Sequence, residues 1–389
     1  MKAVVGGIIL TPSETIENGT ILIDGGKILS IGRGVRVPED AEVIDAKGKY
    51  VTPGLVDGHS HVGMVTDGID WEDSDVNDYY GPVTPYMRAI DGINLYDDGF
   101  REALSGGVTT VYTGPGSSNV IGGIGMIAKT HARTPQEMVI KGFASVKMAL
   151  GPKRTPDEAK PKAPYPTTRM GSVALVRGAL FRARDYMDGR LDPDKLDKEE
   201  KMMMDVLSEL LRGKVPAHIH TSNMPDEIFA VVRIIEEFRI RATIDHGFGS
   251  ELVAEILAEK KIPVIYGPVM MARRSAGSRY VSDKAPGILS SKGVKTSIMT
   301  DHPVIPEKYL RLSAAICVRN GMDPTEALKA ITLNPAESIG VGERLGSIEP
   351  GKDADLVIFS GQPLKIKSTV EKVFTDGKIA YQTQSNTND

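Results

Sequence analysis

Cysteine is nearly absent from this chain, which has one, Cys317, among 389 residues. A single thiol excludes an internal disulfide and any zinc module built from several cysteines. It lies in the apolar run Leu312–Val318, which indicates a buried structural thiol. With no disulfide to maintain, a reducing cytoplasm is the expected location.

Long apolar runs are missing too. No stretch reaches the about 18 apolar residues that a membrane-spanning helix needs. The first residues, MKAVVGGIILTPSETIENG, have apolar positions but neither a long hydrophobic segment nor a small-residue cleavage site. We therefore expect them to belong to the mature protein rather than to a signal peptide.

Positive charge is not in excess. The chain has 47 Lys and Arg against 51 Asp and Glu, a net charge of −4, so it lacks the basic footprint of nucleic-acid binding. The mixed charges around Asp192–Lys201 predict a solvated helical insert. The expected partner is a small-molecule substrate, and neither nucleic acid nor a membrane.

Both ends of the chain have the pattern of β-strands. Residues Gly19–Ile28 alternate in polarity with Gly and Asp at the turns, and Ala354–Phe359 and Val370–Phe374 do the same. A chain of this length suits one large domain and a smaller one. We predict that residues 1–52 and 343–389 pair into one small β-sandwich domain, with the rest of the chain inserted between them.

The inserted part, residues 53–342, alternates short apolar runs with longer amphipathic ones, as in repeated strand–helix units. The predicted strands are Leu55–His59, Val108–Thr113, Ala144–Ala149, Ala217–Thr221, Ala242–His246, Pro263–Tyr266 and Thr296–Thr300. The predicted helices are Asp97–Ser105, Thr167–Met187, Met202–Leu211, Glu227–Phe238 and Glu251–Glu259. This order favours an α/β fold, a (β/α)8 TIM barrel.

A doubly wound open sheet is the alternative. It is weakened because no G-x-G-x-x-G follows a first strand and opens a helix. The glycine-rich segment from Gly114 to Gly125 contains Pro115 and lacks the dinucleotide-binding spacing. We interpret this segment as a loop near the mouth of the barrel.

Six of the seven histidines fall at or just past the carboxyl ends of predicted strands, where barrel enzymes carry their active sites. The six are His59, His61, His218, His220, His246 and His302, and only His131 lies elsewhere. Residues two apart on a strand point the same way, so His59 and His61 project side by side, about 7 Å apart. Neutral imidazole is the commonest ligand for zinc and similar ions.

Each histidine also has a structural interpretation. His59 and His61 could be polar strand-end residues bonded to their neighbours, but the other histidines at similar positions favour a metal site. His220 is the better ligand of its strand because it lies nearer the carboxyl end, and His246 completes a plausible second metal position. His218 lies one layer deeper and is either a support for a ligand or a satisfied core histidine.

Asp301 follows the last predicted strand in Thr300-Asp301-His302-Pro303. A carboxylate there can bind metal through one oxygen and take a proton from bound water through the other. The alternative is a turn or helix-capping aspartate. His302 should point elsewhere and is a candidate for substrate contact.

Lys147 lies in an otherwise apolar strand. A buried ammonium group loses hydration unless it is paired or neutral. A lysine with a lowered pKa can react with carbon dioxide, and the resulting carbamate anion could bridge two cations. A long side chain that binds an anionic substrate, or a salt bridge, would also explain the residue.

Three segments resemble a known family. Thr52–His61, TPGLVDGHSH, is similar to the first-strand signature of the amidohydrolase superfamily. Gly346–Val357 and the preceding Asn334–Ala336 resemble the segment that re-enters that family's small β-domain. The resemblance spans essentially the whole chain and is closest to the group related to imidazolonepropionases and metal-dependent dipeptidases.

The resemblance implies a barrel, a composite β-sandwich, one or two divalent metals that are usually zinc, and a homo-oligomer. By position it assigns these metal ligands: His59, His61, the bridging carboxylated Lys147, His220, His246 and Asp301. His218 departs from the general pattern. Deaminases of the family often have a glutamate shortly after the ligand that matches His220, and the segment Thr221–Met224 has no acid.

These observations predict a hydrolase that cleaves an amide-type carbon–nitrogen bond, in a non-peptide amide or a dipeptide, by attack of metal-activated water. Asp301 is the expected general base. The alternatives are a metal-dependent deaminase of a ring amine, which releases ammonia, and a non-catalytic assembly homologue. The last is disfavoured because such a relative should have lost several of the ligands.

Overall fold

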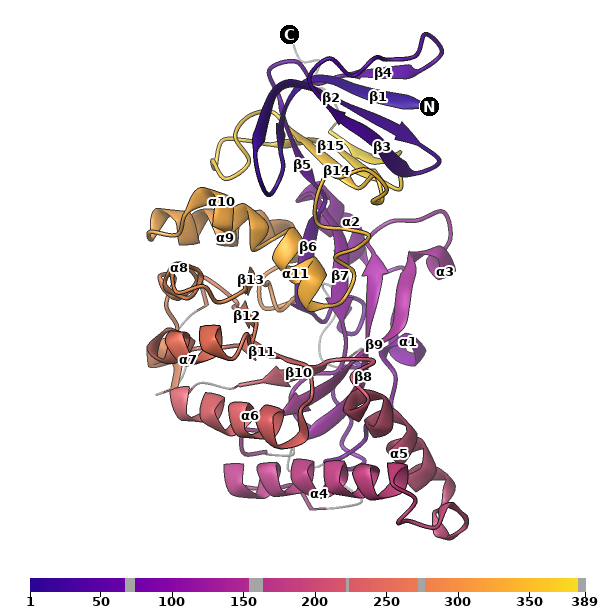
Figure 1. The fold of residues 1–389 in the computed structure, drawn as a ribbon, viewed down its shortest axis with the longest axis vertical. Coiled ribbons are helices and arrows are strands. Elements are labelled where there is room, and N and C mark those ends of the chain that lie inside the picture. Colours follow the sequence, from indigo (N-terminus) through magenta and orange to yellow (C-terminus); the bar gives the residue numbers. More distant parts are fainter. Residues whose placement is uncertain (67–73, 154–163, 222–223, 272–276, 384–389) are drawn as a thin grey trace.

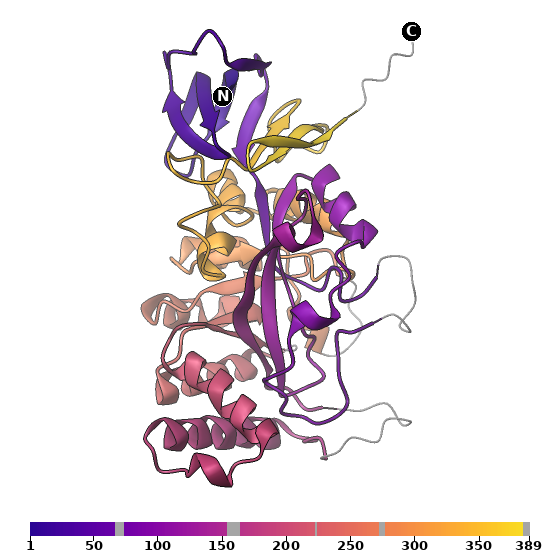
Figure 2. The same ribbon diagram turned by 90° about the vertical axis from the view of Figure 1, so that its right-hand side faces the viewer.

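The structure is a computed structural model that describes residues 1–66, 74–153, 164–221, 224–271 and 277–383. Its strands form two eight-stranded sheets. One sheet combines strands from both ends of the chain at one end of the molecule, and the other lies among the helices below it (Figure 1). Figure 2 shows the indigo amino-terminal strands and the yellow carboxyl-terminal strands side by side.

The composite sheet has the order β16-β15-β14-β5-β1-β2-β3, with β4 paired to β1. Its strands are β1 (Lys2–Leu10), β2 (Thr15–Asp24), β3 (Lys27–Gly32), β4 (Glu42–Asp45), β5 (Tyr50–Pro53), β14 (Leu356–Phe359), β15 (Val370–Thr375) and β16 (Lys378–Gln382). The two ends of the chain meet where β5 pairs antiparallel with β14. Branched and aromatic side chains from both ends, among them Ile21, Val51 and Phe374, pack into one core.

The hairpin between β15 and β16 turns at an Asp-Gly pair. Asp376 and Gly377 have φ values of 46° and 70°. Two adjacent positive φ angles are typical of the tight turns that connect antiparallel strands, and Asp-Gly is a preferred pair there. The predicted composite β-structure of both chain ends is thus confirmed, while the exact limits of the two domains stay a prediction.

The second sheet is the barrel, and its strands follow the chain order from β6 to β13. They are β6 (Leu55–Ser60), β7 (Val108–Thr113), β8 (Ile121–Lys129), β9 (Val139–Ala149), β10 (Ala217–His220), β11 (Ala242–His246), β12 (Val264–Tyr266) and β13 (Thr296–Ile298). All seven predicted strands are among them. Near the carboxyl ends, the backbone of His61 donates to His302 O at 3.0 Å and that of Asp301 to His59 O at 3.3 Å. These bonds join the first strand to the segment after the last, and the barrel fold is confirmed.

Strand β8 lies in the glycine-rich segment, where the sequence predicts a loop. The loop prediction is therefore wrong for this part of the segment. Gly122, Gly123 and Gly125 lie within β8, which runs antiparallel to both β7 and β9. The other neighbouring pairs of the barrel sheet are parallel. A Cβ on Gly125 would lie 2.0 Å from Tyr112 Oη. This glycine therefore admits a close neighbour and is not needed for a turn.

Most of the helices lie along one side of the barrel and at its end away from the composite sheet (Figure 1). The α-helices are α1 (Ala89–Gly92), α2 (Asp98–Ser105), α3 (Pro135–Met138), α4 (Arg169–Met187), α5 (Lys198–Leu211), α6 (Pro225–Phe238), α7 (Ala254–Glu259), α8 (Ala285–Ser291), α9 (Leu310–Arg319), α10 (Pro324–Lys329) and α11 (Leu333–Ser338). The 3-10 helices are η2 (Pro193–Lys195), η3 (Ser250–Val253), η4 (Gly277–Tyr280) and η5 (Glu307–Tyr309). Among the described residues, no helix has the length and apolar character to cross a membrane.

Local signals explain where helices α4 and α5 begin. The Thr168 side chain accepts from the backbone of Gly171 at the start of α4. Asp197 and Glu200 form a reciprocal capping box at the start of α5. The charged segment that predicted a solvated helical insert thus supplies the first turn of α5. In α9, Cys317 is buried and free, as its apolar surroundings in the sequence predict.

A buried ion cluster connects the barrel to the composite sheet. Lys129, at the end of β8, is 2% exposed. Its Nζ lies 2.7 Å from Asp355, 3.1 Å from Asp376 and 3.2 Å from Asp353. Because all three carboxylates come from the carboxyl-terminal part of the chain, this lysine ties that part to the barrel.

Candidate metal centre

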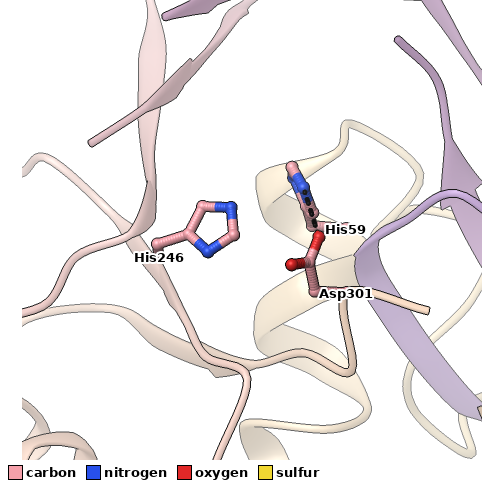
Figure 3. Close-up of side chains that lie close together, drawn as sticks. All are labelled: His59, His246 and Asp301. Atoms are coloured by element: carbon pink, nitrogen blue, oxygen red, sulfur yellow. Dashed lines mark ion pairs between the residues drawn. The ribbon is translucent and has the colours of Figure 1, made fainter. Parts of the chain in front are cut away.

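Three residues meet at the mouth of the barrel: His59, His246 and Asp301 (Figure 3). They come from the end of β6, the end of β11 and the segment after β13. One donor atom of each lies within 4.8 Å of the others. The sequence predicts all three as metal ligands, and the structure brings them together.

The distances in this group fit a bound cation. Asp301 Oδ1 lies 3.4 Å from His59 Nε2 and 3.3 Å from His61 Nε2. Both separations are long for charged hydrogen bonds, which usually span about 2.7–2.9 Å. Zinc with four ligands at about 2.0–2.1 Å holds neighbouring donor atoms about 3.3–3.4 Å apart. The donor set of imidazole nitrogens and a carboxylate oxygen is also one that zinc prefers.

His61 is oriented for binding by its other nitrogen. Its Nδ1 donates to Gly114 O at 2.7 Å, so that nitrogen carries the proton. The lone pair is then on Nε2, the atom that faces Asp301. A hydrogen bond of this kind on the far nitrogen is the usual companion of a metal-binding histidine.

His220 and Lys147 complete the predicted ligand set. The ring of His220 lies 4.0 Å from that of His246. Lys147 is 1% exposed, and its Nζ lies 3.2 Å from His59 Nε2 and 3.3 Å from Nδ1. All six predicted ligands therefore lie at one end of the barrel, around the same point.

Burial favours the neutral forms of His246, His220 and Lys147. It lowers the pKa of His246 to about 3 and holds the pKa of His220 well below its usual range. Burial likewise lowers the pKa of Lys147, although Asp245 and Asp301 oppose this. Neutral imidazoles bind metals without first losing a proton.

Asp301 is held in its ionised form. Burial alone would raise the pKa of its carboxyl group, but the facing histidines, led by His246, hold that pKa well below its usual range. An ionised carboxylate can bind a cation and can also accept a proton. The side chain is 13% exposed, whereas that of His59 is fully buried. Asp301 therefore lies on the side of the group that water can reach.

Two members of the group have unusual backbones. His246 has a φ of 69° and Asp301 a φ of 54°, which side chains other than glycine rarely adopt. Such a conformation costs about 1–3 kcal/mol and is concentrated at functional sites. At His246 it also breaks the alternation of the strand. Adjacent Asp245 and His246 can then both reach His59.

Asp245 is a residue of the site that the sequence interpretation missed. Its Oδ2 lies 2.7 Å from His59 Nδ1 and 3.1 Å from His218 Nδ1. Although burial opposes it, the two histidines hold the pKa of Asp245 well below its usual range. A carboxylate inside the apolar strand β11 needs partners, and this was a signal available in the sequence. His302, by contrast, is buried against Gly99 of α2.

The fold and the site together define a class of protein: a β/α barrel whose strand ends hold histidines and an aspartate arranged for a divalent metal. The family model described as the Amidohydrolase family matches residues 50–381. The chain therefore belongs to the amidohydrolase family, as its motifs predict. It is a hydrolase that acts on carbon–nitrogen bonds.

Individual relatives agree with this assignment. "Amidohydrolase tasK" from Hapsidospora irregularis is 31% identical over 93% of this chain, which spans only 40% of that protein. An imidazolonepropionase from Geobacillus kaustophilus (strain HTA426) is 29% identical over 91% of this chain and 85% of its own length. The solved structure of an amidohydrolase from Thermotoga maritima MSB8 is 35% identical, with a TM-score of 0.90 over 98% of this chain and 100% of that chain.

Proposed function

We propose that this protein hydrolyses an amide-type carbon–nitrogen bond, in a non-peptide amide or a dipeptide, at a divalent metal centre. The proposed ligands are His59, His61, Lys147, His220, His246 and Asp301, and the proposed metal is zinc, as one or two ions. The observation that carries the proposal is the position of Asp301 Oδ1, 3.4 Å and 3.3 Å from two imidazole nitrogens. That spacing is about the edge of a zinc tetrahedron.

A divalent cation bound here would lower the pKa of a water molecule and polarise the scissile carbonyl. Asp301 is ionised, strained into a fixed orientation and partly exposed, so its carboxylate can accept a proton from the attacking water. As the oxygen–carbon bond forms and the carbon–nitrogen bond breaks, Asp301 returns that proton to the leaving nitrogen. The products are a carboxylic acid and an amine.

The chain favours amide hydrolysis over deamination. The segment Thr221–Met224, which follows His220, offers no carboxylic acid to move a second proton. The likeness to an imidazolonepropionase, over most of both chains, also supports the proposal. Ring-amine deamination would instead release ammonia, so a product assay distinguishes the two reactions.

We also propose a carbamate on Lys147. The buried amine lies between the His59 ring and Asp245, 3.8 Å from the Asp245 carboxylate. Burial favours its neutral form, and the neutral nitrogen can attack carbon dioxide, forming the N–C bond and releasing one proton. Mass spectrometry and bicarbonate-dependent reactivation of chelator-treated enzyme should detect the group. Indifference to bicarbonate, with an unmodified lysine, would contradict it.

The central experiment tests Asp301 with zinc-loaded protein and a panel of N-acyl amino acids, dipeptides and cyclic amides. Loss of a positioned base typically lowers the rate about 10²–10⁴-fold. We therefore expect the turnover of Asp301→Asn to fall by at least about 10²-fold. Asp98→Asn is the matched control because Asp98 is 72% exposed on α2. Zinc content, measured by mass spectrometry, separates loss of the base from loss of the metal. Near-full activity of Asp301→Asn would refute the role.

Several expectations from the sequence remain predictions. They are the cytoplasmic location, the homo-oligomeric state, and a small-molecule partner without nucleic acid or membrane. Size-exclusion chromatography with light scattering tests the oligomeric state directly.

A further inference from the structure

A buried chain of three polar side chains lies behind the candidate metal centre. Asp245 Oδ2 is shared by two histidines, at 2.7 Å from His59 Nδ1 and 3.1 Å from His218 Nδ1. All three side chains are fully buried. Of the three, only His59 belongs to the ligand set proposed above, so Asp245 and His218 need their own explanation.

The direction of these hydrogen bonds follows from chemistry. A carboxylate has no proton to donate, so both Nδ1 atoms must carry one. His59 then has its lone pair on Nε2, the atom that lies 3.4 Å from Asp301 Oδ1. If His59 carried its proton on Nε2 instead, that proton would point at the place where the cation should bind.

Asp245 is itself held in place. Its other oxygen, Oδ1, accepts from Thr243 Oγ1 at 2.6 Å. His218 lies flat against Tyr112, with ring centroids 4.2 Å apart and planes 4° from parallel. Tyr112 is fixed in turn by a 2.7 Å hydrogen bond to Ser145. The chain of contacts leaves Asp245 little freedom to turn away from His59.

We propose that Asp245 is a positioning residue that fixes His59 with its proton on Nδ1 and its lone pair toward the metal, and that His218 holds Asp245 in place for this task. The inference rests on the proposed metal centre. It gives His218, which departs from the family's general pattern, a role without metal contact. Asp245 should therefore act on metal affinity through His59 and should touch neither the substrate nor the reacting atoms.

A competing arrangement is a cation bound directly by this trio. Donor atoms of His59, His218 and Asp245 lie within 4.8 Å of one another. However, Lys147 Nζ is already 3.8 Å from Asp245 Oδ2 and 3.3 Å from His59 Nδ1. In addition, both Nδ1 atoms donate their protons to Asp245 Oδ2, so neither has a lone pair to offer a cation.

The test compares zinc affinity and histidine tautomers in the full-length protein. Asp245→Asn keeps the shape but replaces a pure acceptor by a group that can also donate. Supports behind metal ligands typically contribute about 10–100-fold in affinity, and we expect a loss of that size by competition with a fluorescent chelator. Nitrogen–proton correlation spectra should show the His59 proton on Nδ1 in the native protein and a different pattern in the variant.

Two further variants make the result specific. His218→Phe keeps the stacking on Tyr112 but removes the hydrogen bond to Asp245, so it should weaken zinc binding severalfold. It also serves if Asp245→Asn does not fold. Asp98→Asn is the control, because Asp98 is exposed on α2, outside this chain of contacts, and its replacement should leave both the affinity and the tautomer unchanged.

The outcomes separate this inference from the proposed function. If the native protein binds no zinc, the metal centre and the inference both fail. If it binds zinc and folded Asp245→Asn binds it within twofold as tightly, only the positioning role is overturned. A cation found on His218, or an unchanged affinity in His218→Phe, would also overturn it.

Discussion

Asp57 in the first barrel strand is bonded twice to Thr300, which follows the last strand. Asp57 Oδ2 accepts from the Thr300 backbone nitrogen at 2.8 Å and from Thr300 Oγ1 at 2.7 Å. The other oxygen accepts from the backbone of His59 at 3.0 Å. One buried carboxylate therefore sets the distance between His59 and Asp301, across the seam where the barrel closes.

Replacing Asp57 with alanine should destabilise the protein and loosen the metal site together. The change leaves buried N–H donors without a partner, each costing about 1–3 kcal/mol. We expect the free energy of unfolding in urea to fall by about 2–4 kcal/mol, and zinc affinity to fall with it. Asp98→Ala, at an exposed position on α2, should change stability by less than about 0.5 kcal/mol. Equal stability of the two variants would contradict the proposed role of the seam.

Glu307 should make stability fall as pH rises. It is fully buried in η5, and neither carboxyl oxygen has a hydrogen bond of good geometry among the described residues. Burial, and then the facing Asp57, raise the pKa of Glu307 well above 4.5. Above pH 4.5, Glu307 loses its proton in the unfolded chain but keeps it in the folded chain. The free energy of unfolding therefore falls with rising pH until the pKa of Glu307 in the folded protein is reached.

Glu307→Gln removes this penalty because an amide has no proton to lose. At pH 7.5 the variant should therefore have a higher free energy of unfolding than the native protein. The difference should shrink towards zero as the pH approaches 4.5. Thermal unfolding measured across this pH range checks both statements, and a pH-independent difference would argue against a protonated Glu307.

Lys129 should be among the most sensitive positions outside the site. Lys129→Met leaves Asp355 buried without its closest cation, which lies 2.7 Å away in the native protein. Breaking such a buried pair by removing one partner costs about 3–5 kcal/mol. The matched control is Lys27→Met, because Lys27 contacts the same cluster through Asp353 but is 49% exposed. It should cost no more than about 1 kcal/mol. Similar losses in urea unfolding would contradict the difference in burial.

Replacing two glycines by alanine, Gly125 and Gly178, should change the stability of the protein in opposite directions. A methyl group on Gly125 would meet Tyr112 Oη at 2.0 Å and Cζ at 2.4 Å, whereas one on Gly178, inside α4, meets nothing within 4 Å. Gly125→Ala should therefore cost about 3 kcal/mol through overpacking. Gly178→Ala should stabilise the protein by about 0.5–1 kcal/mol through helix propensity. Differential scanning calorimetry gives both, and a tolerated Gly125→Ala would mean that Tyr112 can move.

Much of the fold could be predicted from local patterns. Apolar runs such as Val108–Thr113 and Ala242–His246 coincide with observed strands because the barrel buries both faces of its strands. The hairpin at Asp376 and Gly377 follows from turn chemistry. Strand β8 could not be predicted from local patterns, because its glycines make room for side chains that are distant in the sequence. Tyr112 beside Gly125 is one of these side chains.

The candidate site, too, could be predicted from the sequence only in part. Histidines at strand ends are visible in the sequence, and the position of Asp301 follows from the same reasoning. The pairing of Asp245 with His59 and His218 is not visible, since strand alternation would separate Asp245 from the adjacent ligand His246. Only the positive φ of His246 brings both side chains to His59. Backbone strain of this kind depends on the whole fold and leaves no local pattern.

Because the composite sheet combines both ends of the chain, it can be completed only after the whole barrel has been synthesised. Strand β5 pairs with β14, and the whole barrel is encoded between them. At about 5–20 residues per second, the ribosome needs roughly 15–60 s to make the intervening chain. During that time one edge of β5 has no partner strand, and an unpaired edge is a template for aggregation. Rapid collapse of the barrel, or a chaperone that covers β5, would shorten this exposure, so yield in cells should depend on translation speed through the barrel.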